Sequence, residues 1–276
     1  MYPAPLFKLF GQGVYLYGLL IGLGIIACLI VFFFYTKKKG MPEDVQDFVF
    51  IVAIIAIALG FLIAKLYQAI YDWIETGTFD FYGAGITAMG GFVGGAAVFL
   101  VAYFVGGKLF FKGKKQDLHK KWFNTIFLVA PICILIAHAF GRIGCSMAGC
   151  CHGNFVSNTY VFGTIPRYSY NDATGALTLL GYYVPVQLYE AAFLFLAFGV
   201  LTYLFFHRCN ITMPIYMISY GVWRIVIEFF RTDARGAVIL GLYPSQWQSI
   251  IFIVGGIAII VFYIVKKIPL FFPKNK

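Results

Sequence analysis

The chain has 276 residues, of which 61% are hydrophobic and 12% are charged, against about 45–50% and about 25% in soluble domains. This composition, with a mean hydropathy of +0.85, excludes a soluble globular protein. The formal net charge of +10 is typical of cytoplasmic loops beside anionic lipid, so we expect membrane lipid and no nucleic acid as a partner. The sequence therefore predicts an all-α, multispanning membrane protein, with one membrane domain over residues 1–276.

Apolar runs predict about seven transmembrane helices, because each run approaches or exceeds the roughly 20 residues that cross a bilayer. The predicted spans are 14–35, 48–69, 86–107, 122–140, 184–206, 211–230 and 245–265.

The loop charges predict the orientation of these spans. Fourteen of the 21 Lys and Arg residues lie in loops on one side of the predicted membrane, including the cluster 108–121 and the C-terminal lysines. The positive-inside rule places that side in the cytoplasm, so we expect the N-terminus outside and the C-terminus inside. Segment 141–183 then becomes an extracytoplasmic loop that is large enough to form a small subdomain.

The third span contains two glycine pairs, Gly90 with Gly91 and Gly94 with Gly95. Small residues let helices approach closely. We expect this stripe either to pack against another helix or to open toward a lipid tail.

Segment 141–154, GRIGCSMAGCCHGN, follows the fourth span. Its glycines are expected to let a loop re-enter the headgroup zone and wrap a ligand. Cys145, Cys150 and Cys151 lack the paired spacing of a zinc site. We therefore predict no metal, and leave open a disulfide or three free thiols.

Ionisable residues near the predicted outer ends of the spans are the strongest functional signal, because a charge within a membrane costs several kcal/mol unless it faces protein, water or a ligand. In YGVWRIVIEFFR, Arg224 and Glu228 share a helix face and Arg231 follows on the same stripe. An internal ion pair accounts for Arg224 and Glu228. Arg142 and Arg231 leave a surplus of positive charge, which predicts an anionic ligand such as a lipid phosphate.

Four further polar side chains lie close to these charges in the predicted topology. His138 precedes Arg142 by four residues and is either a structural histidine or a general base. Gln187 and Glu190 begin the fifth span, where we expect hydrogen bonds to a polar ligand, and Tyr189 fits an interfacial anchor.

Six segments, in one order along the chain, resemble motifs of the prolipoprotein diacylglyceryl transferase family. They are YLYGL at 15–19, MGGFVGG at 89–95, GRIGCSMAGCCHG at 141–153, QLYEA at 187–191, YGVWRIVIEFFR at 220–231 and SQWQS at 245–249. The resemblance implies a seven-helix protein of the bacterial cytoplasmic membrane with its N-terminus outside, its C-terminus inside and its active site on the extracytoplasmic side.

The resemblance also implies an activity that uses no cofactor. Members transfer the diacylglyceryl group of phosphatidylglycerol to the lipobox cysteine in the signal peptide of a prolipoprotein, forming a thioether and releasing glycerol phosphate. The catalytic residues implied are Arg142, Arg224 and Glu228, and we expect His138 to be catalytic as well, as the base. The substrate-binding residues implied are Tyr17, Gly90, Gly91, Gln187, Tyr189, Glu190, Arg231 and Gln246.

This chain departs from the family pattern where the acceptor is activated. Met89 replaces a histidine often proposed as the base, and Cys145 and Ala148 replace two asparagines. His138 or His152 would then take over as base. The alternatives are a transferase of the same fold with a different acceptor, a lipid-binding or transport protein without catalysis, and a thiol redox protein.

Overall fold

The computed structural model describes residues 1–231 and 241–271, apart from the side chains of Glu75, Ala88 and Met89. The chain divides into two compact units. Unit 1 comprises Met1–Phe32 and Phe127–Lys276, and unit 2 comprises Phe33–Ile126. Helices α1 (Leu16–Lys38) and α5 (Leu118–Ala148) contribute residues to both units. A single membrane domain stays a prediction.

Unit 2 is built on a close pair of helices, α2 (Glu43–Thr76) and α3 (Ala88–Val101). A Cβ atom on Gly90 would lie 2.8 Å from Cβ of Tyr67, and one on Gly60 would lie 3.2 Å from Cα of Gly95. The glycine stripe therefore packs helix on helix, which confirms the first of the two expectations for it. A π-helical turn, η1 (Ala102–Gly106), the short α4 (Gly107–Phe110) and the 3-10 turn η2 (Gly113–Lys115) complete the unit.

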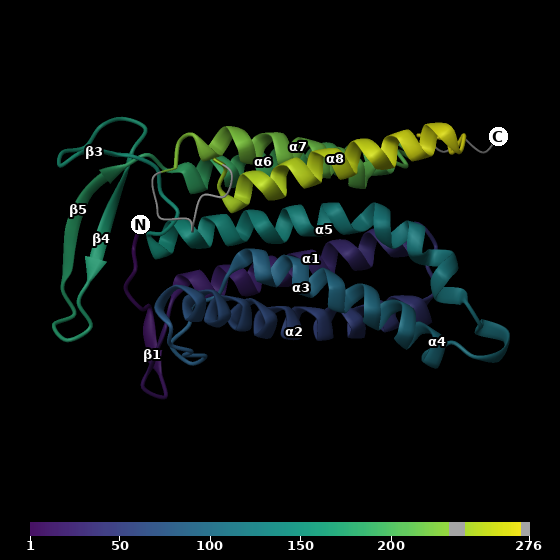
Figure 1. The fold of residues 1–276 in the computed structure, drawn as a ribbon, viewed down its shortest axis with the longest axis horizontal. Coiled ribbons are helices and arrows are strands. Elements are labelled where there is room, and N and C mark those ends of the chain that lie inside the picture. The colour runs from purple at the N-terminus through teal and green to yellow at the C-terminus, as the bar shows by residue number, and fades with distance from the viewer. Residues whose placement is uncertain (232–240, 272–276) are drawn as a thin grey trace. The chain divides into compact units, whose positions relative to one another are not determined.

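In unit 1, α5 contacts the start of α1, α6 (Val186–Phe206) and α7 (Thr212–Glu228), and α7 packs against α8 (Pro244–Val265). Figure 1 shows these helices. A Cβ atom on Gly24 of α1 would lie 2.9 Å from the carbonyl oxygen of Ala137 in α5. A Cβ atom on Gly221 of α7 would lie 2.9 Å from the carbonyl oxygen of Ser249 in α8. Small residues at these crossings let the backbones come close, as membrane helices commonly do.

Among the described residues, six helices are long and apolar enough to cross a membrane, so the chain is a multispanning membrane protein. The sixth predicted span, 211–230, corresponds to α7, which has 17 residues. Its length of about 26 Å is shorter than the roughly 30 Å hydrocarbon core of a bilayer.

Two helix ends differ from the predictions. Helix α5 continues to Ala148, eight residues past the expected end at 140, so Gly141 and Gly144 are helical and do not belong to a re-entrant loop. Gly144 instead allows contact with α1, since its Cβ atom would lie 3.1 Å from the Tyr17 ring. Helix α7 ends at Glu228, so Arg231 lies beyond the helix and does not continue the predicted face of Arg224 and Glu228.

The loop between α5 and α6 folds into a small sheet, an addition to the predicted all-α fold. Strands β3 (Phe155–Ser157), β4 (Ile165–Tyr170) and β5 (Leu177–Tyr183) pair antiparallel in the order β3-β5-β4. Figure 1 shows this sheet beyond the C-terminal end of α5. A short hairpin of β1 (Phe7–Leu9) and β2 (Gln12–Val14) precedes α1.

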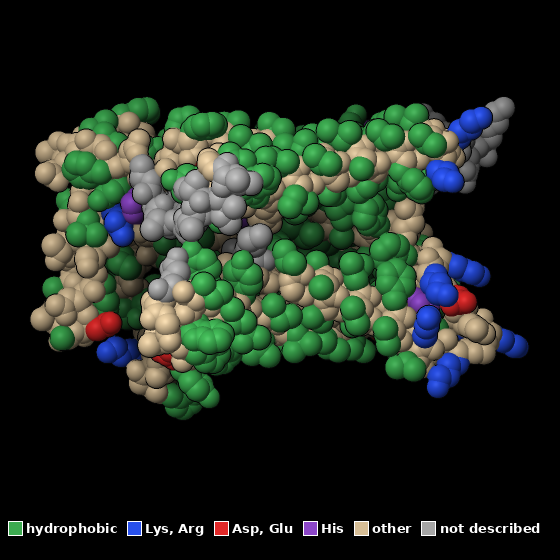
Figure 2. Space-filling model, viewed as in Figure 1, with side chains coloured by type: hydrophobic (Ala, Val, Ile, Leu, Met, Phe, Trp, Pro, Cys, Tyr) green, Lys and Arg blue, Asp and Glu red, His purple; other side chains and the backbone are tan. Residues whose placement is uncertain are grey.

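Apolar side chains cover the outer surface of the helices, as a lipid-facing surface requires. In α2, for example, Ile51, Ile54 and Leu62 are all exposed. Figure 2 shows basic side chains gathered at the end of unit 2 that carries α4 and η2, which includes Lys108, Lys114 and Lys115.

Candidate active site

Glu190 lies at the centre of a buried charge cluster in unit 1. Its side chain is 1% exposed. Oε2 lies 2.9 Å from Nε of Arg142 on α5 and 4.0 Å from Nη1 of Arg224 on α7. One carboxylate on α6 therefore holds two guanidinium groups from two other helices.

Helix α7 supplies a second carboxylate to the same cluster. Arg224 Nη2 lies 3.4 Å from Oε2 of Glu228, the ion pair that the spacing of four predicted. Arg231 is also buried, although it lies beyond the end of α7. Its backbone pairs with Gly153 as an antiparallel bridge, so the chain after α7 adjoins the cysteine-containing segment.

The structure brings His138 into this cluster, as its spacing from Arg142 predicted. Its Nε2 lies 3.9 Å from Glu190 Oε1, and its ring lies 5.3 Å from the ring of Tyr220. Tyr220 donates a hydrogen bond of 3.2 Å to the same carboxylate oxygen. Tyr220 is not among the predicted site residues, although its position four residues before Arg224 places both on one face of a helix.

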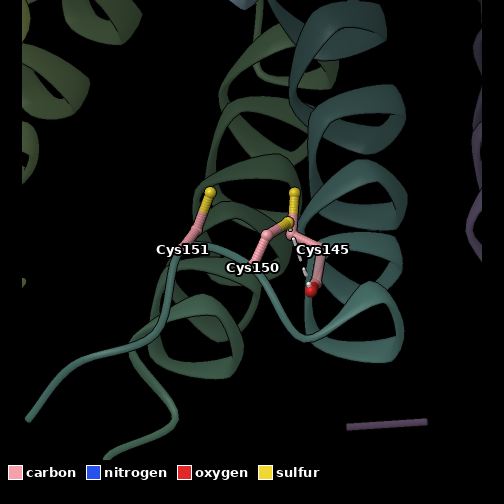
Figure 3. A group of neighbouring side chains, drawn as sticks. All are labelled: Cys145, Cys150 and Cys151. Atoms are coloured by element: carbon pink, nitrogen blue, oxygen red, sulfur yellow. Dashed lines mark hydrogen bonds between the residues drawn. The ribbon is translucent and has the colours of Figure 1, made fainter. Parts of the chain in front are cut away.

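The three cysteines of the signature segment form a second cluster. Their sulfur atoms lie within 4.8 Å of one another, and Figure 3 shows Cys145 on the last turn of α5 with Cys150 and Cys151 on the chain that follows. All three thiols are free. Hydrogen bonds from the thiols of Cys145 and Cys150 lower the pKa of Cys151, and the positive charges of Arg142 and Arg231 lower it further.

Side chains from α6 and the sheet hold the segment that carries these cysteines. Gln187 Nε2 donates a hydrogen bond of 2.5 Å to the carbonyl of Cys150, and Arg167 Nε donates one of 3.1 Å to the carbonyl of Gly149. Gln187 was expected at a lipid headgroup, and its observed contact is with this turn. Arg167 was not selected from sequence, and no local pattern identifies it, because only strand pairing brings it here.

The remaining predicted site residues lie in varied surroundings. Tyr17 packs its ring against Gly144. Tyr189 is exposed and its hydroxyl lies 3.5 Å from the carbonyl of Gly163, which suits an interfacial anchor. Gln246 accepts a hydrogen bond from the backbone N–H of Tyr243 and so caps α8.

The predicted site residues of the third predicted span, Gly90 and Gly91, belong to unit 2. Gly90 and Gly91 lie on α3 against α2, where Gly90 faces Tyr67 and Ala64. Met89 begins the same helix, and its side chain lies outside the described residues. Their roles in substrate binding stay predictions.

The described part of the buried charge cluster brings three arginines and two glutamates together. Guanidinium groups bind phosphate oxygens through charge-assisted hydrogen bonds. The arrangement is therefore suited to an anionic ligand.

Six helices of membrane-spanning length among the described residues, and a buried cluster of arginines and glutamates in unit 1, define a multispanning membrane protein. The model of the prolipoprotein diacylglyceryl transferase family matches residues 5–262. A phosphatidylglycerol–prolipoprotein diacylglyceryl transferase of Clostridium tetani is 34% identical, over 91% of this chain and 94% of its own length. A second one, of Clostridium perfringens, is 32% identical over 91% of both chains, and one of Halalkalibacterium halodurans is 31% identical over 88% of this chain and 80% of its own.

The chain therefore belongs to the prolipoprotein diacylglyceryl transferase family. The resemblance that six ordered motifs predicted is confirmed.

Proposed function

We propose that the protein transfers the diacylglyceryl group of phosphatidylglycerol to the lipobox cysteine of a prolipoprotein. Membership of the family and the names of its relatives support this activity. The observation that carries it is the convergence of Arg142 and Arg224 on Glu190. This carboxylate holds two guanidinium groups from different helices close together, where both can contact the donor phosphate.

The transfer is a substitution at a glyceryl carbon. The acceptor sulfur forms a bond to the carbon, the bond from that carbon to a phosphate oxygen breaks, and its electron pair leaves with glycerol phosphate. Negative charge grows on the phosphate as the bond breaks, so arginines placed in advance stabilise the transition state more than the ground state. Arg142 and Arg224 take this role in the proposal.

The acceptor thiol must lose its proton before it attacks, because the thiolate is the nucleophile. The sequence predicted that His138 or His152 acts as the base that removes this proton. His138 lies at the charge cluster beside Glu190 and Tyr220. His152 lies in the cysteine-containing segment, where its Nδ1 is 2.9 Å from the carbonyl of Gly153.

The proposed location is the bacterial cytoplasmic membrane, with the site on the extracytoplasmic side. Within unit 1, the arginine cluster and the small sheet lie at the α5 C-terminal end. The end of α6 meets the chain after α8, where the backbone N–H of Asn210 donates to the carbonyl of Leu270, close to Arg208 and Lys266. Basic residues at that end support its placement in the cytoplasm.

The direct test supplies the purified full chain with labelled phosphatidylglycerol and a lipobox peptide. We expect the peptide to gain one diacylglyceryl group through a thioether, measured by mass spectrometry, and a matched peptide with serine in place of the cysteine to gain none. Failure to modify the cysteine peptide while phosphatidylglycerol is consumed would favour the second candidate, a transferase of the same fold with another acceptor. The observation that favours this candidate is Met89 at the position of the family's histidine.

A further inference from the structure

The three thiols beside the arginine cluster have the geometry of a metal site. Their sulfur atoms lie within 4.8 Å of one another. Zinc binds thiolate sulfur at about 2.3 Å in tetrahedral geometry, which separates two sulfurs on one ion by about 3.8 Å. The sulfur atoms would therefore have to approach one another by at most about 1 Å.

The backbone explains how cysteines with an unusual spacing come together. Gly149 adopts a left-handed conformation with φ of +73° and reverses the chain after α5. The N–H of Cys150 then donates a hydrogen bond of 3.2 Å to the carbonyl of Cys145. Cys151 has φ of 59°, uncommon for a residue with a side chain, and its sulfur joins the other two. Sequence spacing argued against a metal because it could not show this reversal.

Hydrogen bonds from other segments of the chain also hold this turn, as hydrogen bonds from surrounding groups usually orient metal ligands. Gln187 is 1% exposed and holds the carbonyl of Cys150, while Arg167 holds that of Gly149. The N–H of Tyr2 adds a hydrogen bond of 2.8 Å to the carbonyl of Met147. Three different segments of the chain thus hold the backbone around the sulfur cluster.

The cluster offers three ligands. In residues 1–231 and 241–271, three metal-ligating side chains lie close enough together to share one ion: Cys145, Cys150 and Cys151. His152 points its ring at Tyr183, with centroids 4.6 Å apart, and its Nδ1 at Gly153. Zinc sites with three protein ligands keep a fourth position for water or substrate, and such sites are catalytic.

We propose that Cys145, Cys150 and Cys151 bind a zinc ion whose fourth position takes the acceptor cysteine and presents it as a thiolate. This inference rests on the proposed function. A thiol that coordinates zinc is deprotonated, and the proton passes to water. The sulfur then attacks the glyceryl carbon and leaves the zinc as a thioether, with no change in the oxidation state of the metal.

The position of Cys145 places this nucleophile next to the donor site. Cys145 follows Arg142 by three residues on α5, which is about one helical turn and a rise of about 4.5 Å. The zinc-bound sulfur and the arginine-bound phosphate would then meet across one turn of helix. Activation by zinc also needs no histidine, which suits a chain with Met89 in place of the family's residue.

The first test measures metal content. The full chain, purified in detergent under reducing conditions and loaded with zinc, is expected to retain about one ion per chain by mass spectrometry. Cys145→Ala, Cys150→Ala and Cys151→Ala should each lose it, while Cys209→Ala, a buried thiol outside the cluster, should keep it. Cys150→His preserves a ligand and should retain zinc, which separates loss of a ligand from loss of fold. Equal zinc in the wild type and all three alanine variants would overturn the site.

The second test asks whether the acceptor thiol enters the fourth position. Cobalt(II) in place of zinc reports thiolate ligands by its absorption spectrum. A lipobox peptide should change that spectrum, and the matched serine peptide should not. No difference between the peptides would overturn the activating role.

The two proposals fail in different ways. Full transfer by a chelator-treated, metal-free protein would overturn the zinc proposal and uphold the transferase. Stoichiometric zinc and a cysteine-dependent cobalt spectrum without any transfer from phosphatidylglycerol would support the zinc site and contradict the proposed function.

Discussion

Arg142 Nε lies 2.9 Å from Glu190 Oε2, and this contact joins α5 to α6 within a cluster where the glutamate is 1% exposed. The same oxygen is 4.0 Å from Arg224 Nη1 on α7. Glu190 is thus the shared partner of the two cations that we propose for the donor phosphate. The observed contacts of Glu190 are with these arginines, whereas the sequence predicted hydrogen bonds to a polar ligand; its role in substrate binding stays a prediction.

Loss of the Glu190 charge should destabilise unit 1. Glu190→Gln leaves two buried guanidinium groups without this partner, and we expect a loss of about 3–5 kcal/mol in the free energy of unfolding. Thermal unfolding in detergent measures the effect. Asp172→Asn, at the exposed β4–β5 turn, is the control and should change stability little. An unchanged midpoint for Glu190→Gln would contradict the central position of this carboxylate.

Removal of either phosphate-binding arginine should slow transfer. Arg142→Gln and Arg224→Gln each remove charge-assisted contacts worth about 1.5–3 kcal/mol, which corresponds to a roughly 10- to 150-fold loss in kcat/KM for phosphatidylglycerol. Arg208→Gln, beyond the other end of α6, should retain full turnover. Wild-type rates in both glutamine variants would show that the phosphate binds elsewhere.

The orientation can be tested by reporter fusions. Alkaline phosphatase folds to an active form only outside the cytoplasm. A fusion after Asn171, between β4 and β5, should be active, and one after Lys115, in η2, should be inactive. The reverse pattern would place the small sheet in the cytoplasm and overturn the extracytoplasmic chemistry.

Two glycines of the signature segment should respond differently to substitution. A Cβ atom on Gly144 would lie 3.1 Å from the Tyr17 ring, so Gly144→Ala should cost about 1–3 kcal/mol through overpacking. Gly141, in the same helix, has nothing within 4 Å of the added atom, so Gly141→Ala should be neutral or stabilise by up to about 1 kcal/mol. Equal effects on the unfolding midpoint would mean that α1 and α5 do not approach at Gly144.

The histidine variants separate two routes to the acceptor thiolate. If zinc activates the thiol, His138→Ala and His152→Ala should lower kcat less than about tenfold, since general base catalysis is typically worth about 10²–10⁴-fold. Cys150→Ala should lower it by about 10²-fold or more. A large loss in His138→Ala alone, with zinc retained, would return the role of base to His138, and a loss confined to His152→Ala would assign it to the cysteine-containing segment.

The sequence by itself determined the class of protein, the family and most of the helices. Apolar runs of spanning length are a local property, because every backbone group must be satisfied within each helix in a membrane. The ion pair of Arg224 with Glu228 follows from helical spacing alone. The position of His138 near Arg142 was predictable for the same reason.

Only the tertiary structure decided which charges meet across helices and where the cysteines lie. Glu190 reaches Arg142 and Arg224 because α5, α6 and α7 pack together, and no periodicity within one helix carries that information. The sulfur cluster depends on a chain reversal at Gly149 and on hydrogen bonds from Gln187 and Arg167, which come from later segments of the chain. A spacing rule considers ligands along the chain, whereas a metal site depends on where folding places their atoms in space.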